Sequence, residues 1–260
     1  MTTQAPERPI LRYPGGKWRL APWIISHFPD HKIYVEPFGG GASVLLRKPR
    51  SQYGEVYNDL DGEVVNLFRV LRDFPDELER VVHLTPFSRE ECALAMEGST
   101  DSVERARLLL VRSHMAQGSC VTDVGTGLRS KRAGSALPAA DWANFPQHLH
   151  AIVERMRGVV IENRNALDVM LNYDGHEALF YLDPPYVHSS RANRHARGYR
   201  FEMTDDEHIA LSNAVKQLEG KVIISGYPSE LYDELYQDWE RVERVARTDR
   251  GADNVECLWL

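Results

Sequence analysis

The sequence is poor in cysteine and has no long apolar run, and both absences exclude classes of function. Its 260 residues include only Cys92, Cys120 and Cys257, and no C-x-x-C spacing joins them. Neither a disulfide framework nor a metal site is therefore expected, and a reducing, cytoplasmic location suits the chain best. No stretch approaches the roughly 20 apolar residues that span a bilayer, and residues 1–10 have no apolar signal core, so no membrane role is expected.

An excess of positive charge is also missing, since the formal net charge is -7. A phosphate-binding surface needs local positive charge, so the total argues mildly against nucleic acid as a partner and the distribution of basic residues matters more. The hydrophobic share of 43% is enough for a real core. A chain of this length suits one large α/β domain or a domain with an insertion.

A glycine-rich loop follows an early predicted strand. Residues 33–38 read as a strand, residues 39–41 as a glycine turn and residues 42–47 as the start of a helix. Such a loop offers a cofactor backbone donors at a helix N-terminus. The G-x-G-x-x-G spacing and a Walker lysine are absent, which disfavours a dinucleotide or a nucleoside triphosphate. Upstream, Lys17 follows a pair of glycines, which by itself is typical of a surface turn.

A second predicted strand, residues 55–59, ends in the carboxylate of Asp59. An acid at this place in an α/β fold can bind ribose hydroxyls. The alternative is that Asp59 or Asp61 caps the helix that follows, which is a common role for aspartate.

The most informative stretch is the apolar run of residues 178–182, which is followed by Asp183, Pro184, Pro185 and Tyr186. The run suits a strand buried on both faces, and the two prolines end its ladder. Ligands of open α/β sheets bind just beyond such strand ends. A carboxylate and a proline carbonyl can accept hydrogen bonds from an exocyclic amino group, while a tyrosine stacks on the base that carries it. The alternative is a strand-terminating turn with a helix-capping aspartate.

Read in order, these motifs resemble those of the Dam-type (D12 class) S-adenosylmethionine-dependent DNA adenine-N6 methyltransferases. The resemblance covers roughly residues 10–72 and 159–260. It implies a Rossmann-like methyltransferase fold with a mainly parallel sheet and an antiparallel edge. It also implies S-adenosyl-L-methionine as cofactor, double-stranded DNA as partner and methyl transfer to the N6 atom of adenine.

The resemblance assigns roles residue by residue. Its catalytic motif corresponds to Asp183, Pro184, Pro185 and Tyr186. Its cofactor-binding positions correspond to Tyr13, Lys17, Glu36, Pro37, Phe38, Gly40, Asp59, Asn165 and Asp183. The chain departs from the pattern at Ala42, where the family's loop has its last glycine.

Alternating elements before residue 86 and after residue 158 predict one α/β domain, residues 1–85 with 159–260. Between them the sequence predicts three helices, at residues 88–96, 103–117 and 146–156, with a polar connection over residues 119–138. Residues 86–158 are therefore expected to form a mostly helical inserted domain, and by inference a target-recognition domain.

The sequence contains two clusters of basic residues, although its net charge is negative. The first comprises Arg129, Lys131 and Arg132, near further arginines at 105, 107 and 112, and the second comprises Arg191, Arg194, Arg197 and Arg200. Either cluster alone is usually a solvated face. Because the two flank the predicted base-binding crevice, they favour contact with DNA phosphates.

The expected reaction requires the adenine to leave the base stack, because its amino group is not accessible to the chemistry inside a duplex. No metal or covalent intermediate is needed. Two alternatives stay open. One is methylation of cytosine N4 or a protein amide, which the resemblance disfavours because Asp183 stands where those enzymes have Ser or Asn, and the other is a catalytically silent DNA-binding relative. The sequence gives neither the recognised DNA site nor the oligomeric state, and it leaves open whether the enzyme serves a restriction-modification system.

Overall fold

The computed structural model describes residues 5–117, 127–129, 137–190, 200–247 and 253–260. The strands are β1 (Ile33–Glu36), β2 (Gly54–Asn58), β3 (Val159–Glu162), β4 (Ala178–Leu182), β5 (Lys221–Gly226), β6 (Arg241–Arg247) and β7 (Asp253–Trp259). The α-helices are α1 (Ala21–Ile25), α2 (Ser43–Arg47), α3 (Gly62–Asp73), α4 (Pro75–Leu84), α5 (Arg89–Leu94), α6 (Ser102–Met115), α7 (Pro138–Ala143), α8 (Leu149–Met156), α9 (Ala166–Asn172), α10 (Asp205–Val215) and α11 (Glu230–Leu235). Short 3-10 helices lie at Pro146–His148 and His188–Ser190.

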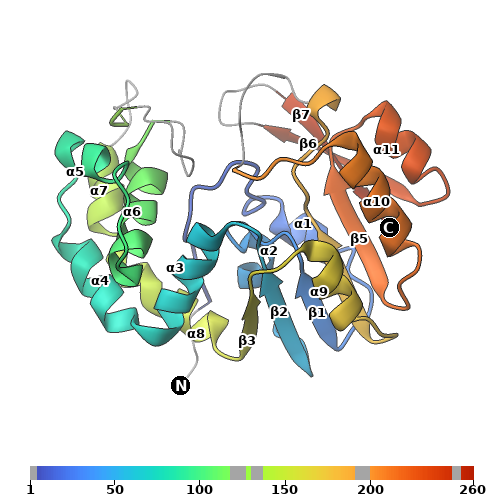
Figure 1. Ribbon diagram of the computed structural model, residues 1–260, viewed down its shortest axis with the longest axis horizontal. Coiled ribbons are helices and arrows are strands. Elements are labelled where there is room, and N and C mark those ends of the chain that lie inside the picture. The colour runs from blue at the N-terminus through green and yellow to red at the C-terminus, as the bar shows by residue number, and fades with distance from the viewer. Residues whose placement is uncertain (1–4, 118–126, 130–136, 191–199, 248–252) are drawn as a thin grey trace. The chain divides into compact units, whose positions relative to one another are not determined.

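The seven strands form one sheet in the order β3-β2-β1-β4-β5-β7-β6 (Figure 1). β1 pairs in parallel with β2 and β4, and β4 pairs in parallel with β5. β7 is antiparallel to both β5 and β6, so the sheet ends in an antiparallel edge. This confirms the predicted mainly parallel, Rossmann-like methyltransferase fold with an antiparallel edge.

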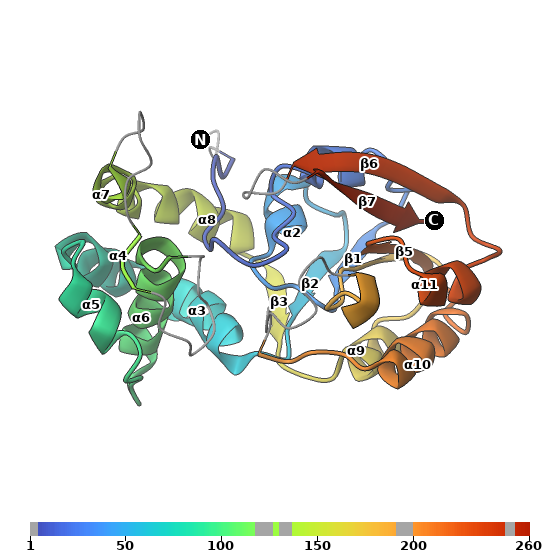
Figure 2. The same ribbon diagram turned by 90° about the horizontal axis from the view of Figure 1, so that it is seen from above.

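The buried strand β4 lies in the middle of the sheet, and all five of its residues are buried, as its apolar run predicts. Helices α9, α10 and α11 cover one face of this part of the sheet (Figures 1 and 2). Their apolar side chains pack there against Phe180, Leu182 and Ile224. The sequence Thr204-Asp205-Asp206-Glu207 has the pattern of a capping box before a helix. The box is present at the start of α10, because the Thr204 hydroxyl accepts from the Glu207 amide and the Glu207 side chain accepts from the Thr204 amide.

Compact packing divides the chain into two units. Unit 1 comprises residues 1–18, 40–47 and 61–161, and unit 2 comprises residues 19–39, 48–60 and 162–260. Unit 1 is mostly helical and includes α3 and α4 as well as the residues between 86 and 158. The helical unit is therefore larger than the predicted insertion, because α3 packs against α6. A target-recognition role for residues 86–158 stays a prediction.

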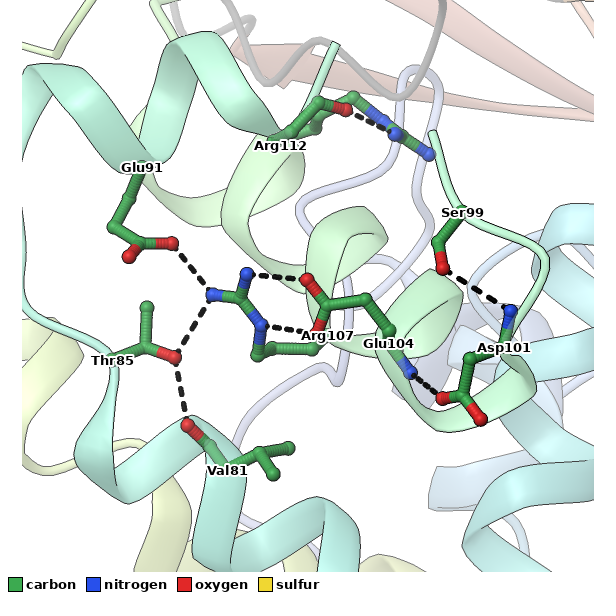
Figure 3. Close-up of polar contacts among 9 residues, drawn as sticks. Val81, Thr85, Glu91, Ser99, Asp101, Glu104, Arg107 and Arg112 are labelled. Carbon is green, nitrogen blue, oxygen red and sulfur yellow. Dashed lines mark hydrogen bonds and ion pairs between the residues drawn. The ribbon is translucent and has the colours of Figure 1, made fainter. Parts of the chain in front are cut away.

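The arginines of α6 serve to hold unit 1 together. The Arg107 guanidinium donates to Glu104 at 2.7 Å, to Glu91 at 2.6 Å and to the Thr85 hydroxyl at 3.1 Å (Figure 3). Arg105 forms an ion pair with Glu63. These arginines have acidic partners within the unit, and the Arg107 side chain is only 11% exposed.

The same helix buries Arg112, whose Nη1 donates to the Ala95 carbonyl at 2.6 Å. The three arginines of α6 that lie near the first basic cluster in the sequence therefore have acidic partners or are buried within unit 1. In the described residues, no helix is both long enough and apolar enough to cross a membrane.

Candidate active site

The order of the strands in the sheet reverses at β1. Strands β2 and β3 lie on one side of β1, and β4 lies on the other side. Val35 of β1 stands in register with Phe180 of β4. The residues that follow these strands, Pro37 and Phe38 on one and Asp183 on the other, therefore lie at the same edge of the sheet. In open α/β sheets this is where ligands bind.

The Asp183 carboxylate is held from the neighbouring strand β5. Its Oδ1 accepts a hydrogen bond of 2.8 Å from Ser225 Oγ. Ser225 is fully buried, and its Oγ also lies 3.1 Å from the Tyr181 hydroxyl. Burial raises the pKa of Tyr181 well above its ordinary value, and the charge of Asp183 adds to this, so the phenol stays protonated. Tyr181 and Ser225 thus form a buried chain of hydroxyl groups that ends on the carboxylate.

Tyr186 is buried, with 4% of its surface exposed. Its hydroxyl donates to Glu256 of β7, which is itself buried. Its ring meets the Tyr227 ring edge-to-face, with centroids 4.5 Å apart and an interplanar angle of 71°. Burial, then the charges of Asp183 and Glu256, raise the pKa of Tyr186 well above its ordinary value. The side chain is therefore a neutral phenol held at both its hydroxyl and its ring.

Asn58, the last residue of β2, ties together the loops at this edge of the sheet. Its Nδ2 donates to the Pro37 carbonyl at 2.8 Å and to the Arg164 carbonyl at 3.1 Å. Its Oδ1 accepts from the Arg164 amide at 2.9 Å. One buried amide thereby fixes the loops after β1 and β3 relative to β2, and Asp59 follows directly.

The loop after β1 has no room for a side chain at Gly39. A Cβ atom there would lie 2.1 Å from Cε2 of Tyr57 and 2.9 Å from the Asn58 carbonyl oxygen, and the Gly39 amide donates to that carbonyl at 2.8 Å. Glycine is the residue that permits this close approach. The loop after β1 therefore packs directly against the end of β2.

Within unit 1, the next part of the same loop meets the N-terminal segment. A Cβ atom on Gly40, whose φ is +46°, would lie 2.9 Å from the Tyr13 ring, so the two predicted cofactor positions are in contact. Ala42 also has a positive φ of 53°, although it carries a side chain. The loop thus keeps a left-handed backbone at the position where the family pattern has glycine.

Comparison with known proteins shows which family the chain belongs to. The profile described as "D12 class N6 adenine-specific DNA methyltransferase" matches residues 13–95 and 131–249. The chain belongs to this family. Its activity is accordingly methyl transfer to the N6 atom of adenine, and its substrate is DNA.

Individual relatives are similar over nearly their whole length. The chain is 26% identical to the Type II methyltransferase M1.LlaDCHI of Lactococcus lactis subsp. cremoris, over 94% of this chain and 90% of that relative. It is 25% identical to the DNA adenine methylase of Serratia marcescens, over 88% and 87%. It is 24% identical to the DNA adenine methylase of Escherichia coli K12, over 88% and 84%.

The structure places the other predicted cofactor residues of this methyltransferase in different settings. Glu36 is buried at the end of β1, where its Oε2 accepts from the Tyr34 hydroxyl at 2.9 Å. Lys17 is buried too, and its Nζ donates to the Gly15 carbonyl at 2.7 Å. Phe38 packs against the core beside β4.

Two polar residues prove to be helix caps. Asp61 caps α3, because its Oδ1 accepts from the Glu63 amide at 2.9 Å, so the cap alternative holds for Asp61 rather than for Asp59. Asn165 caps α9, because its Oδ1 accepts from the Leu167 amide at 2.9 Å. The structure accounts for Asn165 without a cofactor contact, so its predicted role stays a prediction.

Most of the basic residues predicted to contact DNA lie outside the described residues. These are Lys131, Arg132, Arg191, Arg194 and Arg197. Arg200 is exposed. Arg129 is described, and its Nη2 donates to Asp141 at 3.1 Å, so an acid of α7 balances part of its charge.

Three residues of the site were not singled out from the sequence, namely Ser225, Glu256 and Asn58. Each acts through a side-chain contact to a segment distant in the chain. For two of them the sequence contains a weak signal. Ser225 interrupts the apolar strand of residues 221–226, and Glu256 interrupts the apolar run of residues 255–260. Buried polar groups are almost always hydrogen-bonded, so each break indicated a partner.

Proposed function

We propose that this methyltransferase uses S-adenosyl-L-methionine as its methyl donor and acts on an adenine flipped out of double-stranded DNA. The observation that supports the proposal best is the position of Asp183, at the carboxyl end of β4 beside the strand-order reversal, with its carboxylate held by Ser225. The residues present fit a nucleoside cofactor. Asp59 provides a carboxylate for ribose hydroxyls directly after β2, at the same edge of the sheet.

When bound, S-adenosyl-L-methionine supplies an electrophilic methyl group. Within unit 2 we assign the cofactor contacts to Glu36, Pro37, Phe38 and Asp59, with Asn165 as a further candidate. The roles that the family resemblance gives to Tyr13, Lys17 and Gly40 stay predictions. The Asp59 carboxylate would accept from the two hydroxyls of a ribose, since a carboxylate can accept several hydrogen bonds.

The adenine amino group would donate one hydrogen bond to the Asp183 carboxylate and one to the Pro184 carbonyl. Two acceptors directed at this group draw the nitrogen toward tetrahedral geometry and leave its lone pair available for attack. Pro185 stiffens the turn, and Tyr186 provides the ring against which the base lies. Because Tyr186 is 4% exposed, the base reaches its ring only after covering atoms move. Catalysis would come from positioning and from preorganised acceptors.

DNA would be held by basic residues. We assign phosphate contacts to Arg191, Arg194, Arg197 and Arg200, which follow the catalytic motif in the chain. We assign contacts near the target sequence to Arg129, Lys131 and Arg132 of residues 86–158. The exposed position of Arg200, shortly after the catalytic motif in the chain, supports the first assignment.

The proposal is tested with DNA amplified in vitro, which carries no methyl groups. Incubation with the protein and S-adenosyl-L-methionine should yield N6-methyladenine, detected by mass spectrometry of the nucleosides. N4-methylcytosine, or no methylated base, would contradict the proposal.

The variant Asp183→Ala should lose methyl transfer by about 100-fold or more, because the carboxylate acts mainly in the transition state. Its melting temperature should stay close to that of the parent. Activity within tenfold of the parent would contradict the role of Asp183. Glu240→Ala, which removes an exposed carboxylate of unit 2, is the matched control.

A further inference from the structure

Glu256 is a buried carboxylate that the reaction described above does not use. It is 3% exposed, and it receives the hydrogen bond of the Tyr186 hydroxyl from 70 residues away in the chain. Taking a carboxylate out of water has a cost of several kcal/mol unless hydrogen bonds compensate. An apolar residue would fill this buried position without that cost, so the presence of a carboxylate here calls for an explanation.

The sheet topology places Glu256 beside the catalytic motif. β7 runs antiparallel to β5, with Cys257 opposite Gly226 and Leu258 opposite Ser225. Glu256 therefore lies at the carboxyl end of β5, at the edge where Ser225 holds Asp183. Because side chains alternate along a strand, Glu256 points away from the core cluster that contains its neighbour Cys257.

Two contacts of Tyr186 constrain different motions of its side chain. The hydroxyl lies on the axis about which the ring turns, so a hydrogen bond there fixes the direction of that axis but not the plane of the ring. The Tyr227 ring, which meets the Tyr186 ring at 71°, restricts the plane. Together the two contacts restrict both the axis and the plane of the ring.

We propose that Glu256 is a positioning residue for Tyr186. It holds the phenol end of the side chain, and thereby sets where the ring receives the target base, while Tyr227 sets the ring's plane. The inference rests on the proposed function, which assigns Tyr186 to the base. Its consequence is that the antiparallel edge of the sheet, and not only the strands that carry the motifs, determines the rate of methyl transfer.

The kinetic test compares four variants on in vitro amplified DNA. Glu256→Ala and Tyr186→Phe should each lower kcat by about 10-fold or more, as expected when a hydrogen bond to a charged group is removed. The KM for S-adenosyl-L-methionine should change little. Glu256→Gln keeps an acceptor oxygen and should restore most of the rate. The double variant Tyr186→Phe/Glu256→Ala should lose no more than the worse of the two single variants, because both remove the same bond.

The proposal would be overturned if the factors by which the two single variants lower kcat multiply in the double variant. It would also be overturned if Glu256→Gln and Glu256→Ala lower kcat equally. Glu240→Ala serves again as the exposed control and should keep the parent's kcat. If Glu256→Ala fails to fold, the comparison of Glu256→Gln with Tyr186→Phe still decides, since the proposal requires the former to be the more active.

A second measurement does not depend on catalysis. A fluorinated tyrosine placed at position 186 should give one sharp fluorine resonance in the parent and in Glu256→Gln. In Glu256→Ala the resonance should broaden or split, because the ring gains orientations. An unchanged resonance would overturn the positioning role. Failure of the parent to form N6-methyladenine would contradict the proposed function instead, so the two failures are distinguishable.

Discussion

Removal of the Ser225 hydroxyl is the sharpest test of how the site is built. The Oγ atom has one proton, and the shorter of its contacts, 2.8 Å to Asp183 against 3.3 Å to the Leu182 carbonyl, indicates that the carboxylate receives it. The Tyr181 hydroxyl then donates to Ser225 at 3.1 Å. In Ser225→Ala the carboxylate loses a buried donor, and Tyr181 loses an acceptor.

The size of the effect follows from these contacts. A hydrogen bond to a charged group contributes roughly 1.5–3 kcal/mol. If the whole of this contribution stabilises the transition state through the position of Asp183, its loss raises the activation free energy by the same amount. The kcat then falls by about 10- to 150-fold, since about 1.4 kcal/mol corresponds to a factor of ten. The melting temperature should fall as well, by about 2–4 °C for each kcal/mol of stability lost.

The assay measures initial rates of methyl transfer to in vitro amplified DNA at saturating S-adenosyl-L-methionine, with thermal unfolding followed in parallel. Ser212→Ala is a closely matched control. Ser212 is also fully buried in unit 2, but its hydroxyl bonds the Leu235 carbonyl at 3.5 Å, away from the catalytic motif. It should lower stability without lowering kcat. A Ser225→Ala enzyme with a kcat within threefold of the parent would refute the reasoning.

Substitutions at three further positions probe the loops and the helical unit. Gly39→Ala should lower the free energy of unfolding by about 1–3 kcal/mol in denaturant titrations, because its Cβ would overlap the Tyr57 ring; a change below 0.5 kcal/mol would speak against the close approach. Ala42→Val should lower the free energy of unfolding by about 2 kcal/mol, since a β-branched residue disfavours the φ of 53°. Ala42→Gly should change the free energy of unfolding by less than about 1 kcal/mol, because relief of backbone strain offsets the lost methyl group. Burial lowers the pKa of His114 to about 4, so between pH 6.5 and 4 the unfolded chain binds a proton that the folded chain does not. Stability should therefore fall with falling pH across this window, by up to about 1.4 kcal/mol per pH unit, and His114→Gln should remove that part of the slope.

Much of the fold follows from local patterns that the sequence shows directly. The apolar run of residues 178–182 predicts a strand buried on both faces, and β4 is one. The pattern Thr204 to Glu207 predicts a capping box, and α10 begins with one. Because parallel strands end at a common edge, the motifs after β1, β2 and β4 could be placed together without knowledge of any contact.

The contacts that orient those motifs could not be predicted, because they depend on which strand lies beside which. Ser225 reaches Asp183 only because β5 neighbours β4, and Glu256 reaches Tyr186 only because β7 is inserted between β5 and β6. The partners of the α6 arginines could not be predicted for the same reason. The sequence shows that Arg107 is basic, but only the packing of α6 shows that Glu91 and Glu104 face it.

The distance in the chain between the catalytic motif and its partners bears on how the enzyme is made. Ser225 follows Asp183 by 42 residues, and Glu256 follows Tyr186 by 70. A ribosome that has just added Tyr186 has therefore produced the whole motif but neither of the side chains that orient it. Domains form in the order of synthesis at about 5–20 residues per second, so several seconds separate the motif from its last partner. A nascent chain that ends at Tyr186 contains the catalytic motif but lacks the contacts that orient its side chains. The ability to transfer a methyl group therefore arises late in synthesis, when β5 and β7 join the sheet.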